Sequence, residues 1–299
     1  MKTVSQAAAG AALAFAAGGA GLTAYALWEA RQFRLREVTA PVLPAGSSPL
    51  RVLHLSDIHL VPSQSRKLRW LAGLAALAPD LVVDTGDNLS HRDAVPPLMD
   101  ALRGLLQVPG VFVRGSNDYF SPRLRNPIGY LLPDNGKRHT NVPQLPWRDM
   151  TMRMTDAGWV DLTNRRATLE VAGLTIAFAG VDDPHLKYDR LDDVAGPADP
   201  IADVRIGVAH APYVRVVDQF ARDGYDVVMA GHTHGGQVCL PGGRALTTNC
   251  DLPAAYARGL HRWDDSWLHV SAGLGTSPYA RIRVACKPEA TLLTLISKD

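Results

Sequence analysis

The chain lacks several features that would place it in a well-defined class. Its 299 residues include only three cysteines (Cys239, Cys250 and Cys286), and no two of them form a Cys-x-x-Cys pair. An odd cysteine count cannot close a full disulfide framework. The 31 basic and 29 acidic residues leave a net charge of +2, so no nucleic-acid-binding surface is expected. Neither a P-loop nor a Gly-x-Ser-x-Gly turn occurs. With 46% apolar residues, the composition indicates a globular protein with a substantial core.

Residues 1–30 form an apolar segment that differs from the rest of the chain. No charged residue occurs over residues 3–28, which is long enough for one membrane-spanning helix. Lys2 and the small residues Ala24 and Ala26 also fit a cleavable secretory signal. The length favours an uncleaved, single-pass anchor, so we expect attachment to a membrane through this segment. The side of the membrane stays open, because the arginines that follow fit both the positive-inside rule and a half-buried strand.

The remainder is predicted to form one α/β domain. Residues 31–50 are expected to be a linker and a first strand, and residues 51–299 the domain itself. Apolar strands alternate with segments of helical spacing, which is typical of βαβ units. Strands are predicted at 51–55, 81–84, 111–113, 167–171, 174–181, 204–209, 227–230, 268–271, 281–285 and 291–295. Helices are predicted at 68–77, 97–106, 148–157 and 213–222. This order predicts two mixed sheets flanked by helices.

Polar residues follow these strands at the points where the strands end. In such sheets, the carboxyl ends of the strands hold ligands. The first three polar turns lie about 30 residues apart, the length of a βαβ unit. The candidate ligands are Asp57, His59, Asp87, Asn117, His210, His232 and His234. Carboxylate, imidazole and amide donors suit Mn²⁺, Fe²⁺/³⁺ or Zn²⁺, so the pattern predicts a metal centre at the strand ends.

With these residues the sequence resembles the calcineurin-like metallophosphoesterases over residues 50–296. It is most similar to their small, N-terminally anchored branch, through the run Gly-His-Thr-His-Gly-Gly-Gln at 231–237. The resemblance implies a four-layer αββα sandwich that binds two divalent metal ions. It assigns one ion to Asp57, His59 and His234, and the other to Asn117, His210 and His232. Asp87 would bridge the two ions.

The same resemblance implies hydrolysis of a phosphomonoester or phosphodiester, possibly lipid- or nucleotide-linked, by a hydroxide held between the metals. The physical reason for two cations is that they offset the repulsion between the phosphate charge and the hydroxide. The ligand histidines must be neutral to bind metal, so activity should fall as the pH drops.

One motif departs from the family. The usual Gly-Asn-His-Asp/Glu turn supplies a metal-binding Asn and an acid His, whereas this chain has Ser116, Asn117 and Asp118 after Gly115. Without a gap, Ser116 takes the ligand position; slipped by one residue, Asn117 keeps it. Either way the acid histidine is missing. We therefore expect leaving groups that need little protonation, or another acid, Asp118 or His91. The alternative is a metal-binding scaffold of the same fold with impaired catalysis.

Three further residues are candidate substrate contacts: Arg92, Asp183 and His185. Each also has a structural interpretation, Arg92 at a solvated helix start and the Asp183 region as a hydrogen-bonded turn. Residues 121–147 lack periodicity, and a loop of this length beside the strand ends is expected to overhang the site. His54 lies inside an apolar strand and is expected to be a core residue, and the cysteines to be small buried hydrophobes.

Overall fold

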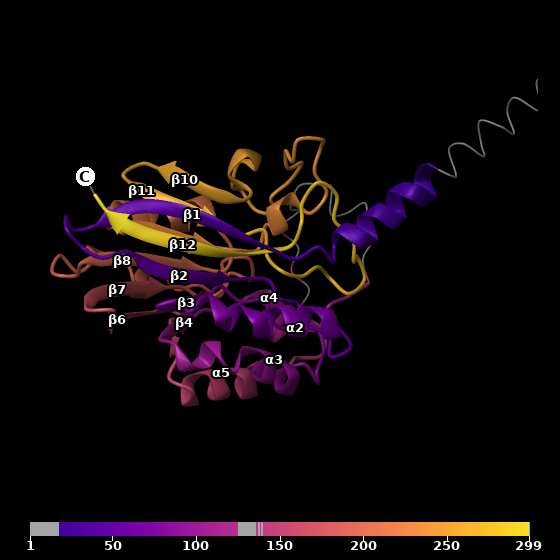
Figure 1. Cartoon of the computed structure of the whole chain (residues 1–299), viewed down its shortest axis with the longest axis horizontal. Coiled ribbons are helices and arrows are strands. Elements are labelled where there is room, and N and C mark those ends of the chain that lie inside the picture. The colour runs from indigo at the N-terminus through magenta and orange to yellow at the C-terminus, as the bar shows by residue number, and fades with distance from the viewer. Residues whose placement is uncertain (1–17, 125–135, 137, 139, 299) are drawn as a thin grey trace, which may run out of the picture.

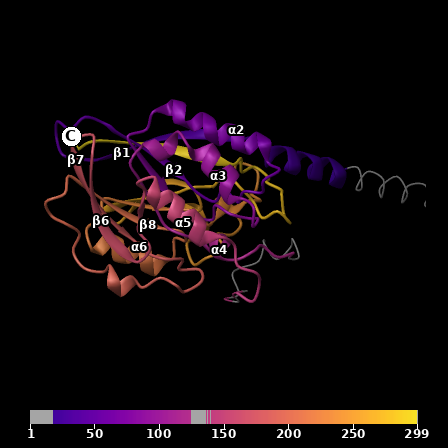
Figure 2. The same cartoon turned by 90° about the horizontal axis from the view of Figure 1, so that it is seen from below.

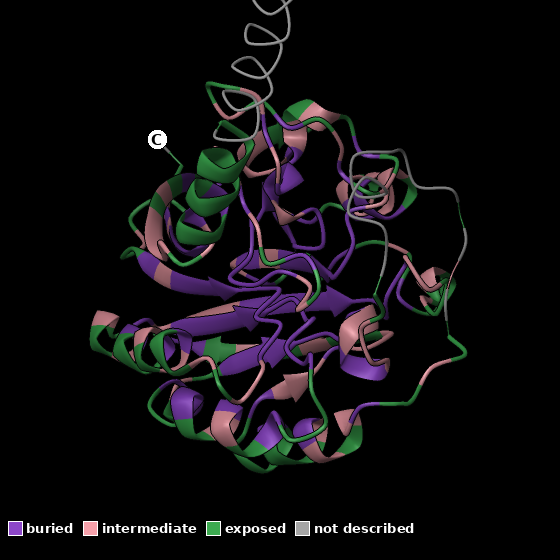
Figure 3. Cartoon of the chain, turned by 90° about the vertical axis from the view of Figure 1, so that its right-hand side faces the viewer, coloured by how far each residue is buried: buried purple, intermediate pink, exposed green. Residues whose placement is uncertain are grey.

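The structure, a computed structural model, describes residues 18–124, 136, 138 and 140–298. Its centre is a pair of six-stranded sheets, in which buried strands form the middle of the molecule and exposed residues lie mainly on the helices outside (Figure 1, Figure 3). Both sheets are mixed, as the alternation of strands and helices predicts. The arrangement brings several strand ends to one side of the molecule.

The first sheet is built mainly of parallel strands. In spatial order it contains β1 (Arg34–Leu43), β12 (Glu289–Ser297), β2 (Leu50–Leu55), β3 (Leu81–Asp84), β4 (Gly110–Phe112) and β5 (Val160–Asp161). Strand β12 runs antiparallel to β2 and parallel to β1, so the last strand of the chain lies between the first two. Strands β2, β3, β4 and β5 are parallel neighbours, so their carboxyl ends meet at one edge.

The second sheet has the same number of strands and antiparallel strands at both edges. In spatial order it contains β10 (Gly259–Trp263), β11 (Ser266–Val270), β9 (Val227–Ala230), β8 (Val204–Ala209), β7 (Leu174–Gly180) and β6 (Arg165–Val171). The inner strands β7, β8, β9 and β11 are parallel to one another. The two sheets pack through apolar side chains such as Val52, Val83, Phe178, Ile206 and Met229, all of them buried.

Helices cover the outer face of each sheet. On the first sheet lie α2 (Ser65–Gly73), α3 (Val95–Leu102) and α5 (Trp147–Asp156), with α3 between the other two (Figure 2). They bury Leu71, Leu98 and Met150 against that sheet. On the second sheet, α6 (Val214–Arg222) buries Val217 and Phe220. The fold is therefore the four-layer αββα sandwich that the resemblance implied.

Short helical turns complete the described chain. They are α4 (Ser116–Tyr119) and the 3₁₀ turns η1 (Leu74–Leu77), η2 (Leu105–Gln107), η4 (Leu191–Asp193), η5 (His234–Gly236) and η6 (Ala254–Tyr256). Two of them, α4 and η5, contain residues of the predicted metal centre.

The strand predicted at 281–285 is wrong. Only Val284 makes an isolated bridge, to Val238. Arg283 is fully buried and its side chain donates to backbone carbonyls, while Ala285 has a φ of 50°, which ends any extended run. The strand β10 was not predicted, because its residues Gly259–Trp263 do not form an apolar run.

A helix over residues 18–29 precedes the sheets and projects from them (Figure 1). Its last residue, Glu29, is buried and accepts hydrogen bonds from the backbone N–H groups of Ala285 (3.0 Å) and Cys286 (2.9 Å). Of the predicted anchor, residues 1–17 lie outside the described residues. Within residues 18–124 and 140–298, no helix has the length and apolar character needed to cross a bilayer.

Candidate metal centre

The predicted ligands lie at the ends of strands from both sheets. Asp57 and His59 follow β2, Asp87 follows β3, His210 follows β8, and His232 and His234 follow β9. Most of these residues have left-handed backbone conformations, which turn the chain sharply after each strand. Their φ values are 50° for Asp57, 46° for His59, 58° for Asp87, 68° for His232 and 50° for His234. Such conformations are unfavourable for residues with a Cβ and concentrate at functional sites.

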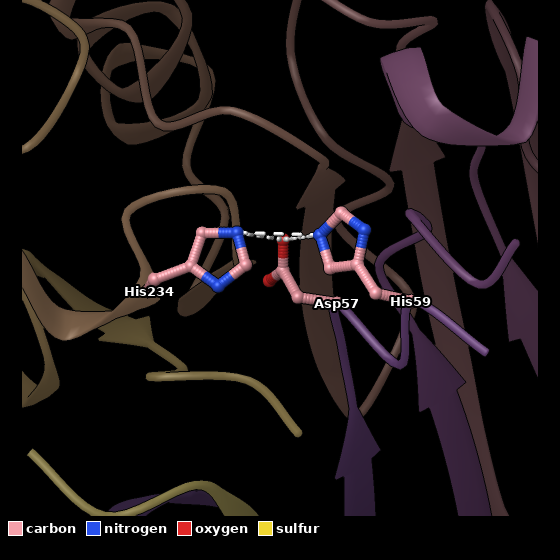
Figure 4. Close-up of side chains that lie close together, drawn as sticks. All are labelled: Asp57, His59 and His234. Carbon is pink, nitrogen blue, oxygen red and sulfur yellow. Dashed lines mark hydrogen bonds and ion pairs between the residues drawn. The ribbon is translucent and has the colours of Figure 1, made fainter. Parts of the chain in front are cut away.

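One group of donors consists of Asp57, His59 and His234. The Oδ1 atom of Asp57 lies 3.9 Å from Nε2 of His59 and 3.6 Å from Nε2 of His234. The two histidines point their Nε2 atoms at each other across 3.3 Å, on either side of the carboxylate (Figure 4). The three donor atoms lie within 4.8 Å of one another, which is close enough for all three to bind one ion.

A second group joins Asp87 and His210 to Asp57. The Oδ2 atom of Asp87 lies 3.5 Å from Nε2 of His210 and also 3.5 Å from Nε2 of His59. Asp87 therefore lies between one histidine of each predicted ion, as a bridging carboxylate must. The donor atoms of Asp57, Asp87 and His210 are again mutually within 4.8 Å.

Backbone carbonyls determine which nitrogen of two of these histidines carries the proton. Nδ1 of His210 lies 2.7 Å from the carbonyl of Thr85, and Nδ1 of His234 lies 3.2 Å from the carbonyl of Gly275. A carbonyl can only accept, so Nδ1 of His210 donates. Nδ1 of His234 is assigned as a donor too, because it lies closer to the Gly275 carbonyl than to the guanidinium of Arg283, at 3.5 Å. In the neutral ring this leaves a lone pair on Nε2, directed into the centre. Outer hydrogen bonds of this kind orient metal-binding histidines.

Two buried donor atoms support the fit to a cation. Asp57 Oδ1 and His210 Nε2 are fully enclosed, and neither has a hydrogen-bond partner among the described residues. Buried polar atoms are normally paired, because an unpaired one costs about 1–3 kcal/mol. Divalent ions bound to these two atoms would satisfy both of them.

The electrostatics keep most of the histidines neutral. Burial lowers the pKa of His59 and of His232 to about 4, and lowers the pKa of His234 well below its usual value. His210 differs: burial opposes its charge, but the carboxylate of Asp87 outweighs burial and raises the pKa of His210 well above 6.5. A cation bound beside Asp87 would compete directly with that proton, since metal binding releases protons from its ligands.

His232 and Asn117 lie next to these two groups. The ring of His232 is 5.2 Å from that of His210, and its Nε2 is 3.1 Å from the carbonyl of Asn249, so Nδ1 is the nitrogen left for an ion. The Asn117 amide nitrogen lies 2.7 Å from Asp87 Oδ2. Amide nitrogen and oxygen are assigned from such contacts, and rotating the amide would direct its oxygen to the same place.

Asp118 has a different position from the one expected of a catalytic acid. Its carboxylate is fully buried and accepts four backbone N–H bonds, from Gly115 (3.0 Å), Asp87 (2.9 Å), Asn88 (2.7 Å) and Leu89 (3.3 Å). It thus holds the turn that carries Asp87. In the described part of the chain it does not line the pocket over the metal centre.

The other candidate acid and the candidate anion contact also lie outside this pocket. The side chain of His91 is 46% exposed and lies 3.7 Å from Asp93, and the side chain of Arg92 is 84% exposed. Neither belongs to the described lining. Both follow Asp87 closely in sequence, but the buried segment Asn88–Ser90 ends before them and the chain turns outward.

The prediction for residues 183–185 agrees better with the geometry. His185 lines the pocket, and its ring lies 4.4 Å from that of His232. Asp183 is buried beneath it and accepts the backbone N–H of His185 at 2.8 Å. Tyr213 holds the other side of the His185 ring, with its hydroxyl 3.2 Å from Nδ1. His185 thus faces the pocket, whereas Asp183 supports it from behind.

The structure adds arginines that sequence reasoning missed. Arg123 and Arg138, both within the 121–147 loop expected to overhang the site, line the pocket. Arg283 is buried behind His234, where it donates to the carbonyls of Gly275 (2.7 Å) and His234 (3.3 Å). The Pro- and Arg-rich loop was a signal for the first two. For Arg283 the signal was its place in the family-like tail, which assigned it no role.

Comparison with known proteins agrees with this geometry. Residues 50–236 match the calcineurin-like phosphoesterase family. The chain belongs to this family. The phosphoesterases are hydrolases that bind divalent metals, and the matched residues include every ligand candidate named above. The match confirms the resemblance over residues 50–236 of the 50–296 that the sequence suggested.

Several curated relatives of this phosphoesterase are similar over nearly their whole length. The uncharacterized protein YpbG of Bacillus subtilis is 28% identical over 293 residues, covering 94% of each chain. The uncharacterized metallophosphoesterase YkoQ of the same organism is 27% identical over 256 residues, covering 83% of this chain and 84% of YkoQ. Escherichia coli phosphodiesterase YaeI is 25% identical over 267 residues, covering 84% of each.

Proposed function

We propose that this chain hydrolyses a phosphomonoester or phosphodiester with two divalent ions bound at the centre. The observation that carries the proposal is the convergence of buried, unpaired donor atoms, above all Asp57 Oδ1 and His210 Nε2. Bound metals would supply Lewis-acid activation of water and would neutralise the phosphoryl charge. The name of YaeI, a phosphodiesterase, supports a phosphodiester as substrate.

The ligand sets are those that the family resemblance implies, and the clustering of Asp57, His59 and His234 supports the first of them. Asp57, His59 and His234 would hold one ion, and Asn117, His210 and His232 the other, with Asp87 shared between them. Asn117 is favoured over Ser116 because its amide reaches Asp87, whereas the Ser116 hydroxyl is hydrogen-bonded, within the described chain, to the Asn117 amide alone, at 3.4 Å. Mn²⁺, Fe²⁺/³⁺ and Zn²⁺ suit this mixture of carboxylate, imidazole and amide donors.

Residues at the pocket rim would bind the substrate. Arg123 and Arg138 bring positive charge to a lining in which Asp87 is the one acidic member among the described residues. They would attract an anionic ester and hold its oxygens by charge-assisted hydrogen bonds. His185 faces the same space and would donate to the ester, with Tyr213 fixing its ring and Asp183 its backbone.

The absence of a histidine at Asn117 favours a second candidate, a metal-binding scaffold with impaired catalysis. Asp118 and His91 do not line the pocket in the described chain, so neither replaces that histidine. General acid catalysis contributes roughly 10²–10⁴-fold. If the enzyme is active, nitrophenyl esters should therefore be cleaved much faster than alkyl esters, and equal rates would contradict this dependence.

Membrane association is the remaining part of the proposal. The helix over residues 18–29 leaves four large apolar side chains exposed, at 42–58%: Leu22, Tyr25, Leu27 and Trp28. Tyrosine and tryptophan are enriched where a helix enters the bilayer interface. The full chain should sediment with phospholipid vesicles and stay bound at high salt, because apolar contacts are not screened. Protein that remains in the supernatant would contradict this part.

The decisive experiment compares the wild-type protein with Asp87→Ala. We expect two metal equivalents per chain, turnover of bis-nitrophenyl phosphate with added Mn²⁺, and loss of both the metal and the turnover in the variant. Asp100→Ala is the matched control, since Asp100 is exposed and pairs only with Arg103 on the surface. Two metals without turnover on a broad substrate panel would support the scaffold instead.

A further inference from the structure

Two of the three cysteines lie together directly behind the metal centre. The thiol of Cys239 donates to the carbonyl of Gly235 at 3.2 Å. The thiol of Cys286 donates to the carbonyls of His234 (3.2 Å) and Gly235 (3.5 Å). The two sulfur atoms thus share one acceptor, although 47 residues separate them in the chain, and that acceptor adjoins a candidate metal ligand.

Backbone contacts bring the two cysteines together. The segment of Cys239 runs beside Val284, whose carbonyl accepts the Cys239 N–H at 2.9 Å. After Ala285, with its left-handed φ of 50°, the chain turns so that Cys286 faces back toward Cys239. The Glu29 carboxylate holds this turn by accepting from the backbone N–H groups of Ala285 and Cys286. The contact therefore depends on three separate segments of the fold.

The side chains around the two sulfur atoms are small. The buried cluster that contains both cysteines is otherwise made of alanines, Ala245, Ala257 and Ala272. The guanidinium of Arg283 lies 3.7 Å from the Cys286 sulfur.

We propose that Cys239 and Cys286 form a redox-active pair that closes to a disulfide. Because Cys239 is 5% and Cys286 1% exposed, the segment has to open locally before the reaction. The Cys286 sulfur then attacks a disulfide such as oxidised glutathione and loses its proton, giving a mixed disulfide and one reduced glutathione. Cys239 then attacks the mixed disulfide at Cys286 and releases the second glutathione. The protein loses two electrons and two protons, and one molecule of oxidised glutathione becomes two of reduced glutathione.

Closure would change the support of His234. A disulfide brings its sulfur atoms to about 2 Å and has no S–H groups. The carbonyls of His234 and Gly235 would lose their thiol donors, and the turn η5 would have to adjust. The functional consequence rests on the proposed metal centre: the disulfide form should bind metal about 10–100-fold more weakly, as expected when the orientation of a ligand is disturbed.

The test of the pair does not depend on activity. The full chain is incubated with oxidised glutathione, then denatured for thiol counting, intact mass and peptide mapping. We expect the thiol count to fall from three to one, the mass to fall by two hydrogen atoms, and one linked peptide to join Cys239 and Cys286. Retention of all three thiols, or a link that involves Cys250, would overturn the proposal.

Matched variants complete the experiment. Cys250→Ser should still form the disulfide, whereas Cys239→Ser and Cys286→Ser should not; Cys239→Ala and Cys286→Ala serve if a serine variant fails to fold. Titration with Mn²⁺ alone should show weaker binding after oxidation and recovery after reduction. If the reduced protein binds no Mn²⁺, the proposed function fails while the thiol result stands. If the disulfide forms and Mn²⁺ binding does not change, the proposed effect on His234 is wrong.

Discussion

Two groups of buried histidines in this molecule differ in how their ring nitrogens meet. In the pair His54–His269, which spans the two sheets, the Nδ1 atoms lie 2.8 Å apart and His54 Nε2 lies 3.0 Å from the Thr85 hydroxyl. In the metal centre, the Nε2 atoms of His59 and His234 also face each other, at 3.3 Å. Residue type is the same in both groups, and three of the four rings are buried: His54, His269 and His59 are at most 3% exposed, whereas the side chain of His234 is 17% exposed.

The difference lies in the partners of the other nitrogen. The Nδ1 atom of His234 already donates to a carbonyl, so its Nε2 presents a lone pair to His59. In the His54–His269 pair, one proton between the two Nδ1 atoms makes a hydrogen bond. Burial alone therefore does not mark a ligand. A histidine can bind a cation when one ring nitrogen donates to a backbone carbonyl and the other ring nitrogen has no hydrogen-bond partner.

The largest expected effect separates the two groups directly. His210→Ala should lose metal and hydrolysis, because it removes a donor that points into the centre. His54→Ala should keep the metal but lose about 1–3 kcal/mol of unfolding free energy, since it leaves His269 Nδ1 buried without a partner. Metal content and urea denaturation of both variants test this. Metal loss in His54→Ala with full binding in His210→Ala would reverse the comparison.

A pH dependence of stability should come next in size. Burial lowers the pKa of His269 to about 4, whereas in the unfolded chain it is near 6.5. The unfolded state therefore takes up the proton first. The stability of the metal-free protein should be complete above pH 6.5 and fall as the pH approaches 4, by up to about 3 kcal/mol from this residue.

The control for this dependence is His269→Gln, which keeps a donor and an acceptor but does not titrate. Its unfolding free energy, measured by denaturation between pH 4 and 7, should fall less steeply than that of the wild type. If the unfolding free energy of His269→Gln depends on pH as steeply as that of the wild type, the acid sensitivity comes from the metal-centre histidines instead. The two groups of histidines would then differ in titration as well as in geometry.

The smallest effect concerns the outer partner of His59. Ser90 Oγ lies 3.2 Å from Nδ1 of this histidine. Ser90→Ala should weaken metal binding about 10–100-fold without changing the number of ions bound, because the ring loses its orientation. Ser63→Ala, at an exposed position, is the control. Unchanged affinity in Ser90→Ala would show that packing alone orients His59.

The candidate ligands could be predicted because each follows an apolar strand and parallel strands end at a common edge. The directions in which side chains point could not be predicted from the sequence. His91 lies four residues after Asp87 and still faces solvent. Asp118 lies beside the candidate ligand Asn117, but its carboxylate binds backbone N–H groups that only the folded turn brings together.

The error at residues 281–285 has a similar cause. The alternation of that segment resembles a strand, but a fully buried arginine needs carbonyl acceptors on several sides. Its acceptors include the carbonyls of Ala272, Gly275 and His234, which lie outside the strands of both sheets, and the segment that carries Arg283 lies beside them. The hydrogen bonds of one buried side chain thus determine the path of the backbone here. The alternation of apolar and polar residues carries no information about those hydrogen bonds.

The left-handed backbone conformations at five candidate ligands have a consequence for the evolution of this sequence. At each of them glycine would relieve the backbone, so a mutation that destroys the centre would at the same time make the turn easier to form. The fold therefore offers no protection of its own to these side chains. They would persist only while selection for what they bind exceeds the gain in stability from losing them.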